Sequence, residues 1–384
     1  MHSEKIHVAR TFDEIESLRN VWNTMPFFVW ADIDFYLSVI RSRPEVLRPH
    51  VVLLEKSGRP MALLVARLEE IPFRSRIGYK VVFSPTVRSL TVVYGGIAYA
   101  DDNSGEDLFK ALVASIENGD ADVLMLGNLR TDTSFYRSSL SYAGFFRHQH
   151  FTMTSKHWRL FLPPSYDDFL ASRTRSTRES VRRYKRRLER EFGNELIFEV
   201  YREEKDYDRI VRDLALIAGK TYQRGLGVGF EPTEEQLSHL RLSLKHRWYR
   251  AYVLYLRGEP VAFWDGHAYK GTFFISIPGY DPSFSDYRVG LYVQMRMIED
   301  LCRDPDVKVL DYGLGDADYK RQFGNDSWEE RNVVIFSPTL KGISVNMIST
   351  AILAITKASK YLLSSVGVFE KVKSIWREKL RQGG

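Results

Sequence analysis

Apolar and polar residues alternate between Arg250 and Gly324 in a way that predicts a strand-rich unit. The runs Ala251–Leu256 and Val261–Trp264 are rich in β-forming residues, and a short link with Gly258 joins them. This pattern is typical of an antiparallel hairpin. A third apolar run follows and ends at Pro278-Gly279, a strong turn signal. We therefore expect three consecutive strands here.

A helix and a further strand complete this unit. The helix follows a polar loop, and its apolar positions recur at steps of four, three and four, which place them on one helical face. These positions are Leu291, Met295, Ile298 and Cys302. Val307–Tyr312 is the next predicted strand. The order strand, strand, strand, loop, helix, strand predicts an α/β (α+β) unit whose mixed sheet is mostly antiparallel.

The first half of the chain repeats this order. Gly58–Ala62 corresponds to Gly258–Ala262 at an offset of 258 − 58 = 200 residues. A strand, a helix and a strand are then predicted in the same order, at residues 90–96, 107–116 and 123–127. Self-similarity on this scale indicates two copies of one domain. We expect a domain at 1–155, a second at 156–340 and a helical tail at 341–384.

The two predicted copies differ in the residues that could carry chemistry. The later copy has Arg288 and Gly290 before its helix, and a Tyr319-Lys320 pair after its last strand. The earlier copy has no equivalent of that pair. We therefore expect the C-terminal copy to be catalytic, and the N-terminal copy to pack against it or to shape the acceptor cleft.

The net charge of +6 is concentrated in two segments. Residues 173–191 and 341–384 each carry +6, so the remainder carries 6 − 6 − 6 = −6. The first segment predicts a helix that begins with a capping box at Ser176 and Glu179. It is either a solvated helix or an electropositive wall for a phosphate-bearing substrate. No nucleic-acid reader motif is present, so DNA is not an expected partner.

The tail is apolar from Gly342 to Thr356, and Lys357 and Lys360 then interrupt it. Residues 369–380 predict a basic amphipathic helix. No uninterrupted run of about 18 apolar residues occurs, so we expect no conventional spanning helix. The tail either contacts a membrane peripherally or folds back on the domain. One cysteine and no apolar signal segment predict a cytoplasmic protein, with peripheral contact at the inner face of the membrane left open.

The order of elements and several motifs resemble a known family. Over residues 173–324 the Gly-Tyr-Asp-Pro around Tyr280, Asp311, Gly315 and the Tyr319-Lys320 pair resemble the cellulose-biosynthesis (CelD-type) acetyltransferases. These belong to the GNAT superfamily of acyl-CoA N-acyltransferases and are similar to the FemAB aminoacyl transferases. The resemblance implies acyl-CoA as co-substrate, an amine acceptor and no permanently bound cofactor.

The resemblance also implies where the donor would bind. Backbone groups at the start of the Leu291 helix would hold the pyrophosphate, because a helix N-terminus favours anions. The end of the third strand would pair with the pantetheine arm. The implied donor-binding residues are Ile277, Gly279, Arg288, Val289, Gly290 and Leu291. The loop lacks the full Arg/Gln-x-x-Gly-x-Gly/Ala pattern of the superfamily, which leaves room for another activated acyl donor.

Candidate catalytic and acceptor residues follow from the chemistry of acyl transfer. A base is needed for the attacking amine; the candidates are Asp265 and His267, on one strand face, and Asp311. An acid is needed for the leaving thiolate, and Tyr319 is the first candidate, before Tyr280. The expected acceptor contacts are Tyr222, Arg224, Tyr280 and Lys320.

Structural interpretations of the same residues stay open. Asp311 would cap the turn at Gly313–Gly315, His267 would be a surface histidine and Lys320 would pair with an acidic neighbour. No cluster has metal-ligand spacing, so no metal is expected.

The leading hypothesis is an acyl-CoA-dependent N-acyltransferase. The resemblance implies that its acceptor is an amine of a polysaccharide or envelope precursor, or a membrane-associated lipid amine. Two alternatives remain. One is a FemAB-like transferase that uses aminoacyl-tRNA, and its support is the basic segment at Arg182–Arg190. The other is a non-catalytic GNAT-like scaffold in envelope polysaccharide synthesis.

Overall fold

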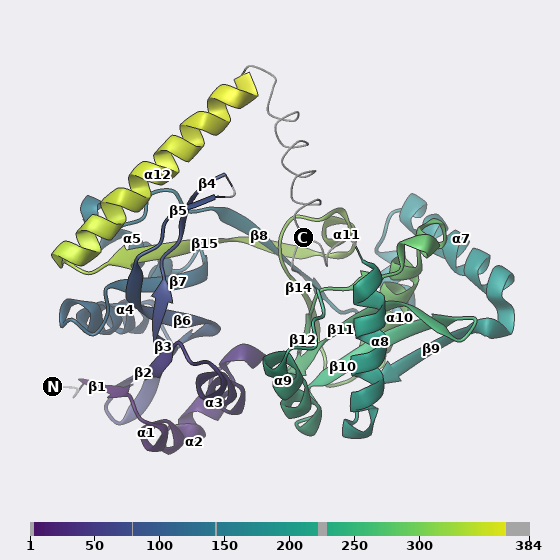
Figure 1. Cartoon of the computed structure of the whole chain (residues 1–384). Coiled ribbons are helices and arrows are strands. Elements are labelled where there is room, and N and C mark those ends of the chain that lie inside the picture. The colour runs from purple at the N-terminus through teal and green to yellow at the C-terminus, as the bar shows by residue number, and fades with distance from the viewer. Residues whose placement is uncertain (1–3, 79, 143, 222–228, 366–384) are drawn as a thin grey trace. The chain divides into compact units, whose positions relative to one another are not determined.

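The computed structural model describes residues 4–78, 80–142, 144–221 and 229–365, and Figure 1 shows the chain. It divides into two compact units. The first comprises Met1–Ser155 and the chain from Glu329 onward, and the second comprises Lys156–Trp328. Each unit has a mixed sheet flanked by helices, so the expected tandem α/β fold is confirmed.

The first unit is built on a sheet with strand order β1-β2-β3-β6-β7-β15. All neighbouring pairs in it are antiparallel except β6 with β7. Its elements are β1 (Glu4–Ala9), α1 (Phe12–Ser17), α2 (Arg19–Thr24), η1 (Val29–Ala31), α3 (Ile33–Ser42), β2 (Val46–Lys56), β3 (Arg59–Pro72), β4 (Ser75–Ile77), β5 (Lys80–Phe83), β6 (Thr86–Tyr99), α4 (Asp102–Glu117), β7 (Val123–Arg130), α5 (Ser134–Ser141), η2 (Phe145–Arg147), β15 (Asp326–Phe336, from Glu329 onward) and α12 (Leu340–Ser365).

The second unit has the strand order β8-β14-β12-β11-β10-β9, and the short β13 pairs with β11. Here β12 and β14 form the parallel pair. Its elements are β8 (Thr154–Phe161, from Lys156 onward), α6 (Tyr166–Ala171), α7 (Arg175–Phe192), η3 (Gly193–Glu195), β9 (Leu196–Tyr201), η4 (Glu204–Asp206), α8 (Tyr207–Lys220), α9 (Glu234–Lys245), β10 (Tyr249–Leu256), β11 (Glu259–Tyr269), β12 (Thr272–Ile275), β13 (Gly279–Tyr280), η6 (Pro282–Tyr287), α10 (Val289–Arg303), β14 (Val309–Leu314) and α11 (Asp318–Phe323).

The predicted internal repeat extends to the register of the strands. In the hairpin β2–β3 the turn residues Ser57 and Gly58 have φ of 53° and 74°, and in β10–β11 Arg257 and Gly258 have φ of 56° and 81°. Two consecutive residues with positive φ are typical of the type I′ turn, which favours glycine at its second position. The register shifts after Leu54 in the first hairpin and after Leu254 in the second. The hairpins therefore correspond residue by residue.

The sheet of the second unit is buried on both faces. Every residue of β10 is buried, and its side chains alternate between two apolar clusters. Tyr252 and Leu254 pack in the cluster that contains α10, while Ala251 and Val253 pack in the cluster that contains α8 and α9. Alternate side chains of a strand point to opposite faces of its sheet. The α10 helix therefore covers one face, and α8 and α9 cover the other.

In each unit, the last strand of the sheet comes from a part of the chain that is far in sequence from the strand with which it pairs. In the first unit β7 pairs with residues 330–336 of β15, which follow the whole second unit in the sequence. In the second unit β14 pairs with residues 157–161 of β8, which precede it. Residues 329–340, which the sequence assigns to the C-terminal copy, therefore belong to the first unit.

Two local predictions differ from the structure. The α7 helix is capped by Thr174, whose hydroxyl accepts from the N–H of Thr177, and not by Ser176. The tail forms one helix, α12, that continues through Lys357. The amphipathic helix expected at 369–380 lies outside the described residues.

Candidate active site

The sheet of the second unit opens beside the start of α10. Strands β12 and β14 pair at three positions, of which Phe274 with Asp311 is the last. Beyond this point the chain no longer pairs with β14 but continues along β11, its neighbour on the other side. The N–H of Ser276 donates to the carbonyl of Asp265 (2.8 Å), and Gly279–Tyr280 then pairs with β11. The parallel pair is thus held at one end and separates at the other.

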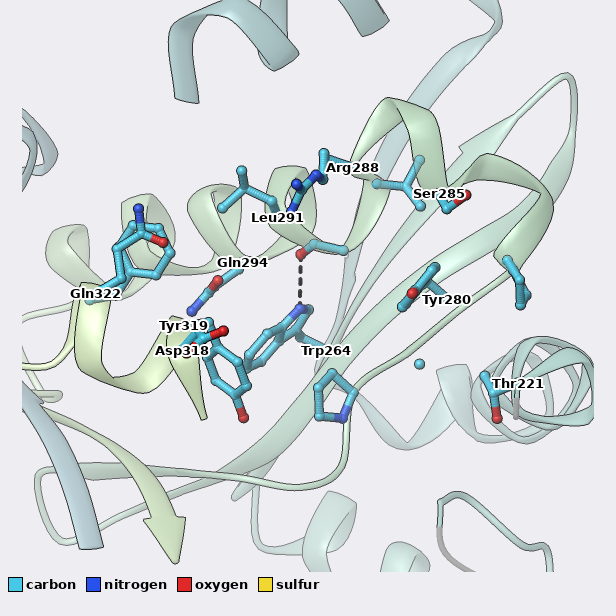
Figure 2. A pocket seen from close by; sticks show the side chains of 16 residues that line it. Thr221, Trp264, Tyr280, Ser285, Arg288, Leu291, Gln294, Asp318, Tyr319 and Gln322 are labelled. Atoms are coloured by element: carbon cyan, nitrogen blue, oxygen red, sulfur yellow. Dashed lines mark hydrogen bonds between the residues drawn. The ribbon is translucent and has the colours of Figure 1, made fainter. Parts of the chain in front are cut away.

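A cavity of about 510 Å³ lies at this opening (Figure 2). Its volume falls in the range of about 300–1,000 Å³ that is typical of small-molecule sites. The wall is formed by residues 278–280, which follow β12 and no longer pair with β14, together with the start of α10, the helix α11 and one side chain of β11. The lining residues are Thr221, Trp264, Pro278, Gly279, Tyr280, Pro282, Ser285, Arg288, Val289, Gly290, Leu291, Gln294, Asp318, Tyr319, Gln322 and Phe323.

The first turn of α10 presents main-chain donors to this cavity. Arg288, at the N-cap, has a left-handed backbone (φ 55°, ψ 41°) and makes no side-chain cap. Among the described residues, no acceptor is found for the N–H groups of Val289 and Gly290. Unpaired N–H groups and the helix dipole together favour an anion at this position. The exposed guanidinium of Arg288 adds positive charge at the same place.

Trp264 joins β11 to the start of α10. Its indole Nε1 donates to the carbonyl of Gly290 at 3.0 Å, so the strand and the first helical turn are fixed together (Figure 2). Opposite, Gly279 lies so close to Phe263 that a Cβ atom there would be 2.5 Å from the ring. Only glycine fits this approach without displacement of the ring.

Tyr319 lies in the first turn of α11 and contributes its ring to the cavity wall. Burial raises the pKa of the Tyr319 phenol to about 12. The phenol is therefore neutral at ordinary pH and able to donate a proton. The sequence prediction of Tyr319 as an acid thus agrees with its place at the cavity.

Sequence reasoning missed two buried residues of the wall, Trp264 and Gln294. The amide of Gln294 donates to the hydroxyl of Tyr312 at 3.4 Å and is only 2% exposed. Gln294 follows Leu291 by three residues, so it interrupts the predicted apolar face with a polar group. A polar residue on a helix face predicted to be buried was the available sequence signal that this position is functional or bonded to a buried partner, because buried polar groups need partners.

A second hollow of about 490 Å³ adjoins the cavity and extends it toward α7. The two share Tyr280, Ser285 and Arg288. The remaining lining residues of the hollow are Tyr184, Arg187 and Asp286. The guanidinium of Arg288 lies 5.6 Å from the centre of the Tyr184 ring. An electropositive path therefore leads from the start of α10 onto α7.

Asp311 does not line the cavity. Its Oδ1 lies 2.8 Å from Nε2 of His157 and accepts from the N–H of Gly313 at 2.7 Å. These contacts fix the bulge within β14 between Asp311 and Gly313, close to the turn that the structural interpretation of the sequence proposed. The catalytic role predicted for Asp311 is therefore not supported, because its carboxylate is occupied in a buried network.

Asp265 and His267 share one face of β11, as predicted, but they do not line the cavity. The hydroxyl of Tyr249 donates to Asp265 at 2.9 Å, and its ring meets that of His267 edge to face. Tyr249 belongs to the cluster with α8 and α9, whereas Trp264 belongs to the cluster with α10. Burial raises the pKa of Asp265 to about 6 and lowers the pKa of His267 to about 4.

The remaining predicted residues divide into four groups. Lys320 is buried, and its Nζ donates to the carbonyls of Leu314 (2.5 Å) and Gly313 (3.3 Å). It secures the end of β14 and does not line the cavity. Among the described residues it forms no ion pair, and burial lowers its pKa to about 8. Ile277 is exposed beside the wall but is not part of it. Tyr222 and Arg224 lie outside the described residues. Tyr280 and the expected donor residues Gly279, Arg288, Val289, Gly290 and Leu291 all line the cavity.

Comparison with known proteins agrees with this geometry. Residues 175–321 match the family model described as an acetyltransferase (GNAT) domain. No curated protein matches the sequence. Among solved structures the chain is similar to FemX, with 10% identity and a TM-score of 0.58 over 90% of this chain and 100% of that one.

Two more distant structures are also similar. One is a tandem GNAT protein from the clavulanic acid biosynthesis pathway, with 9% identity and a TM-score of 0.47 over 88% of this chain and 99% of that one. The other is L-PGS from Bacillus licheniformis, with 12% identity and a TM-score of 0.42 over 77% and 86%. Of the three, FemX alone has a TM-score above 0.5, and at 10% identity that likeness concerns the fold.

The family match covers the segment that forms the cavity. Residues 175–321 therefore form a GNAT-fold acetyltransferase domain, and the match supports a transferase enzyme. The fold implies an acyl donor and an amine acceptor.

Proposed function

We propose that the protein is an N-acyltransferase that binds acyl-CoA in the cavity at the start of α10 and transfers the acyl group to an amine. The observation that supports this proposal is the convergence of three groups on one cavity. They are the unpaired N–H groups of Val289 and Gly290, the strand end Pro278–Tyr280 that leaves its parallel neighbour, and the neutral phenol of Tyr319.

Each group has a role in the proposed reaction. The N–H groups and Arg288 hold the diphosphate of the donor. The free strand edge pairs with the amide-containing arm of the donor, as an added strand would. The ammonium first loses a proton to solvent. The neutral amine then attacks the thioester carbon, so that a C–N bond forms, the C–S bond breaks and the nitrogen loses its extra proton to solvent. Tyr319 gives its proton to the departing thiolate sulfur and regains one from solvent.

The first unit presents the opposite electrostatics at the equivalent position, which supports donor binding in the second. There β6 and β7 form the parallel pair, and α4 follows β6 as α10 follows the β12–β13 segment. The carboxylate of Asp101 caps α4 by accepting from the N–H of Ser104 at 2.8 Å, and Asp102 lies in the first turn. Fixed negative charge therefore stands where a diphosphate would bind.

The acceptor follows from the family resemblance. The residues that carry the CelD-type pattern include Tyr280 and Tyr319, both of which line the cavity. We propose an amine of a polysaccharide or envelope precursor, or of a membrane lipid, as the acceptor.

A second candidate donor is aminoacyl-tRNA, as in FemAB-like transferases. The observation that favours it is the basic face of α7, which begins at the second hollow with Arg187. The exposed basic residues of this helix are Arg182, Arg183, Lys185, Arg186, Arg187 and Arg190. A row of cations beside the cavity complements the phosphates of a tRNA stem. Such binding would weaken steeply as the salt concentration rises.

Titration calorimetry of the full chain with acetyl-CoA, a long-chain acyl-CoA and aminoacyl-tRNA separates the candidates. Micromolar binding of a CoA ester, competed by free CoA, supports the proposal. Binding of tRNA without any binding of a CoA ester overturns it in favour of the second candidate. Failure of every donor to bind indicates the non-catalytic scaffold.

A further inference from the structure

The helix α12 buries polar side chains and exposes large apolar ones. Its fully buried residues include Asn346 and Ser349, at 2% and 0% exposure. Met347, Ile348 and Ile355 are 57%, 43% and 53% exposed. A helix that packs on a soluble domain normally buries its apolar face. The outer surface of α12 therefore presents large apolar side chains to solvent, although solvent would disfavour them.

Hydrogen bonds fix this orientation. The amide of Asn346 donates to the carbonyls of Phe146 (2.7 Å) and His148 (3.1 Å), at the short helix η2. Farther along α12, the hydroxyl of Thr356 donates to the carbonyl of Arg76 in β4 (3.0 Å). Rotation of α12 to hide its apolar residues would break these bonds and leave polar groups without partners.

The elements that hold α12 expose apolar side chains of their own. Phe145 and Phe146 of η2 are 72% and 65% exposed. The hairpin β4–β5 exposes Ile77, Val81 and Val82. Figure 1 shows α12 beside this hairpin. We call the large exposed apolar residues of α12, η2 and β4–β5 the apolar face; they are Ile77, Val81, Val82, Phe145, Phe146, Leu340, Met347, Ile348 and Ile355. Large exposed apolar surfaces of this kind mark binding sites.

The chain segments that form the apolar face carry basic residues and no acidic ones. Residues 71–87, 134–155 and 339–365 contain no Asp or Glu, although the chain has 49 of them. The hairpin and its approach carry Arg74, Arg76 and Lys80, all exposed. On α12, the Nζ of Lys357 lies 4.4 Å from the centre of the Phe151 ring. Two acidic residues of other elements, Glu117 and Asp122, are neutralised by ion pairs with Arg147 and Lys341. Apolar residues bordered by further cations complement a surface that is anionic and has an apolar interior.

We propose that the apolar face docks the protein on a bilayer of anionic phospholipid, with α12 parallel to the membrane plane. By length and composition, residues Leu340–Ser359, with a mean hydropathy of 1.2, could cross a membrane. From the sequence we expect no spanning helix, because Lys357 interrupts the apolar run. The bonds of Asn346 and Thr356 to η2 and β4 favour the flat orientation, because a crossing helix would have to lose them. Docking of this kind is independent of the proposed transferase reaction.

Vesicle flotation of the full chain tests the proposal. With vesicles of phosphatidylcholine and phosphatidylglycerol we expect the protein to float, and with phosphatidylcholine alone we expect at least about tenfold less bound protein. High salt should weaken binding, because it screens the basic residues. Alkaline carbonate should release the bound protein, since a peripheral helix is not held as a spanning one is. Retention after carbonate, or equal binding to both vesicles, would overturn the proposal.

The double variant Met347→Glu/Ile348→Glu should reduce the bound fraction about tenfold or more, since both charges would enter the interface. The matched control is Ile197→Glu/Leu216→Glu, at residues of similar exposure in the second unit. It should float as the native chain does, and circular dichroism should be unchanged in both variants. Undiminished flotation of the first variant contradicts the proposal. Dimerisation in solution that this variant abolishes would assign the apolar face to a second copy of the chain instead.

Discussion

The rings of Tyr319 and Trp264 meet edge to face, with 5.6 Å between centroids and 87° between planes. Trp264 is in turn bonded to the carbonyl of Gly290. The phenol on α11 and the first turn of α10, where we propose that the diphosphate binds, are therefore positioned by one side chain of β11. Such a fixed separation is what a transferase requires, because the carbonyl to be attacked and the diphosphate of one donor must be held together.

Replacement of Tyr319 by phenylalanine should lower turnover with little change in donor affinity. The variant keeps the ring contacts and loses the proton donor, whose contribution is typically about 10²–10⁴-fold. Steady-state kinetics together with calorimetry measure the two effects separately.

Tyr312→Phe is the matched control for this variant. Tyr312 packs against Tyr319, with 5.9 Å between ring centroids, but does not line the cavity. It should keep native turnover. A parallel loss of turnover and affinity in Tyr319→Phe, or an equal loss in Tyr312→Phe, would mean that Tyr319 serves packing.

The charge of Arg288 should govern donor affinity. Asparagine and aspartate both tolerate the left-handed backbone of this residue. We expect Arg288→Asn to weaken acyl-CoA binding about tenfold, because a charge-assisted bond is lost. Arg288→Asp should weaken it by roughly a further tenfold, since it recreates the negative charge found at Asp101. Calorimetry measures both.

Arg257→Asn controls for the backbone, because Arg257 is also left-handed (φ 56°) but lies in the β10–β11 turn. Its donor affinity should equal that of the native chain. If Arg288→Asp bound acyl-CoA normally, the start of α10 would not be the diphosphate site.

Asp265 should make stability depend on pH. Its pKa is raised from about 3.9 in the unfolded chain to about 6 in the fold, through burial. The native state therefore holds the proton more tightly, and stability falls as pH rises between these values, by about 2–3 kcal/mol in all. We expect Asp265→Asn to be the more stable protein at about pH 8 and to match the native chain near pH 4.

Urea unfolding of both proteins at the two pH values measures this difference. Turnover of Asp265→Asn adds a second test, because the residue lies away from the cavity. Activity near the native level agrees with a structural role; near-complete loss in a folded variant would restore Asp265 as the base.

Asp101→Ala should affect the first unit without affecting the donor. Loss of the cap of α4 should destabilise the fold by about 1 kcal/mol. Donor affinity and turnover should stay native, because we place the donor on α10. Tighter binding of acyl-CoA or a second binding event in calorimetry would instead show a latent donor site in the first unit.

The fold was largely predictable because its determinants are local. The step of apolar residues in α10 and the paired glycines of the two hairpins depend on neighbours within one element, so sequence pattern identified them. The strand of residues 326–336 was overlooked. Its partner β7 lies about 200 residues earlier, and no short-range pattern records that pairing.

The candidate site was predictable where backbone carries the chemistry. Arg288, Gly290 and Gly279 were found from a turn and a helix start. Asp311 and Lys320 were also selected as polar residues near this strand end, but their side chains bond to protein groups and do not line the cavity. Whether a polar side chain faces a cavity or a partner depends on tertiary packing, which pattern alone does not contain.

The place of β15 in the sequence has a consequence for synthesis. The first 155 residues leave the ribosome long before Glu330–Phe336 are synthesised. The sheet of the first unit therefore lacks its last strand, β15, while the entire second unit emerges. During that interval β7 presents an unpaired edge that other chains could join. The N-terminal unit should therefore mature last although it is translated first, and a chain that stops short of residue 329 should aggregate.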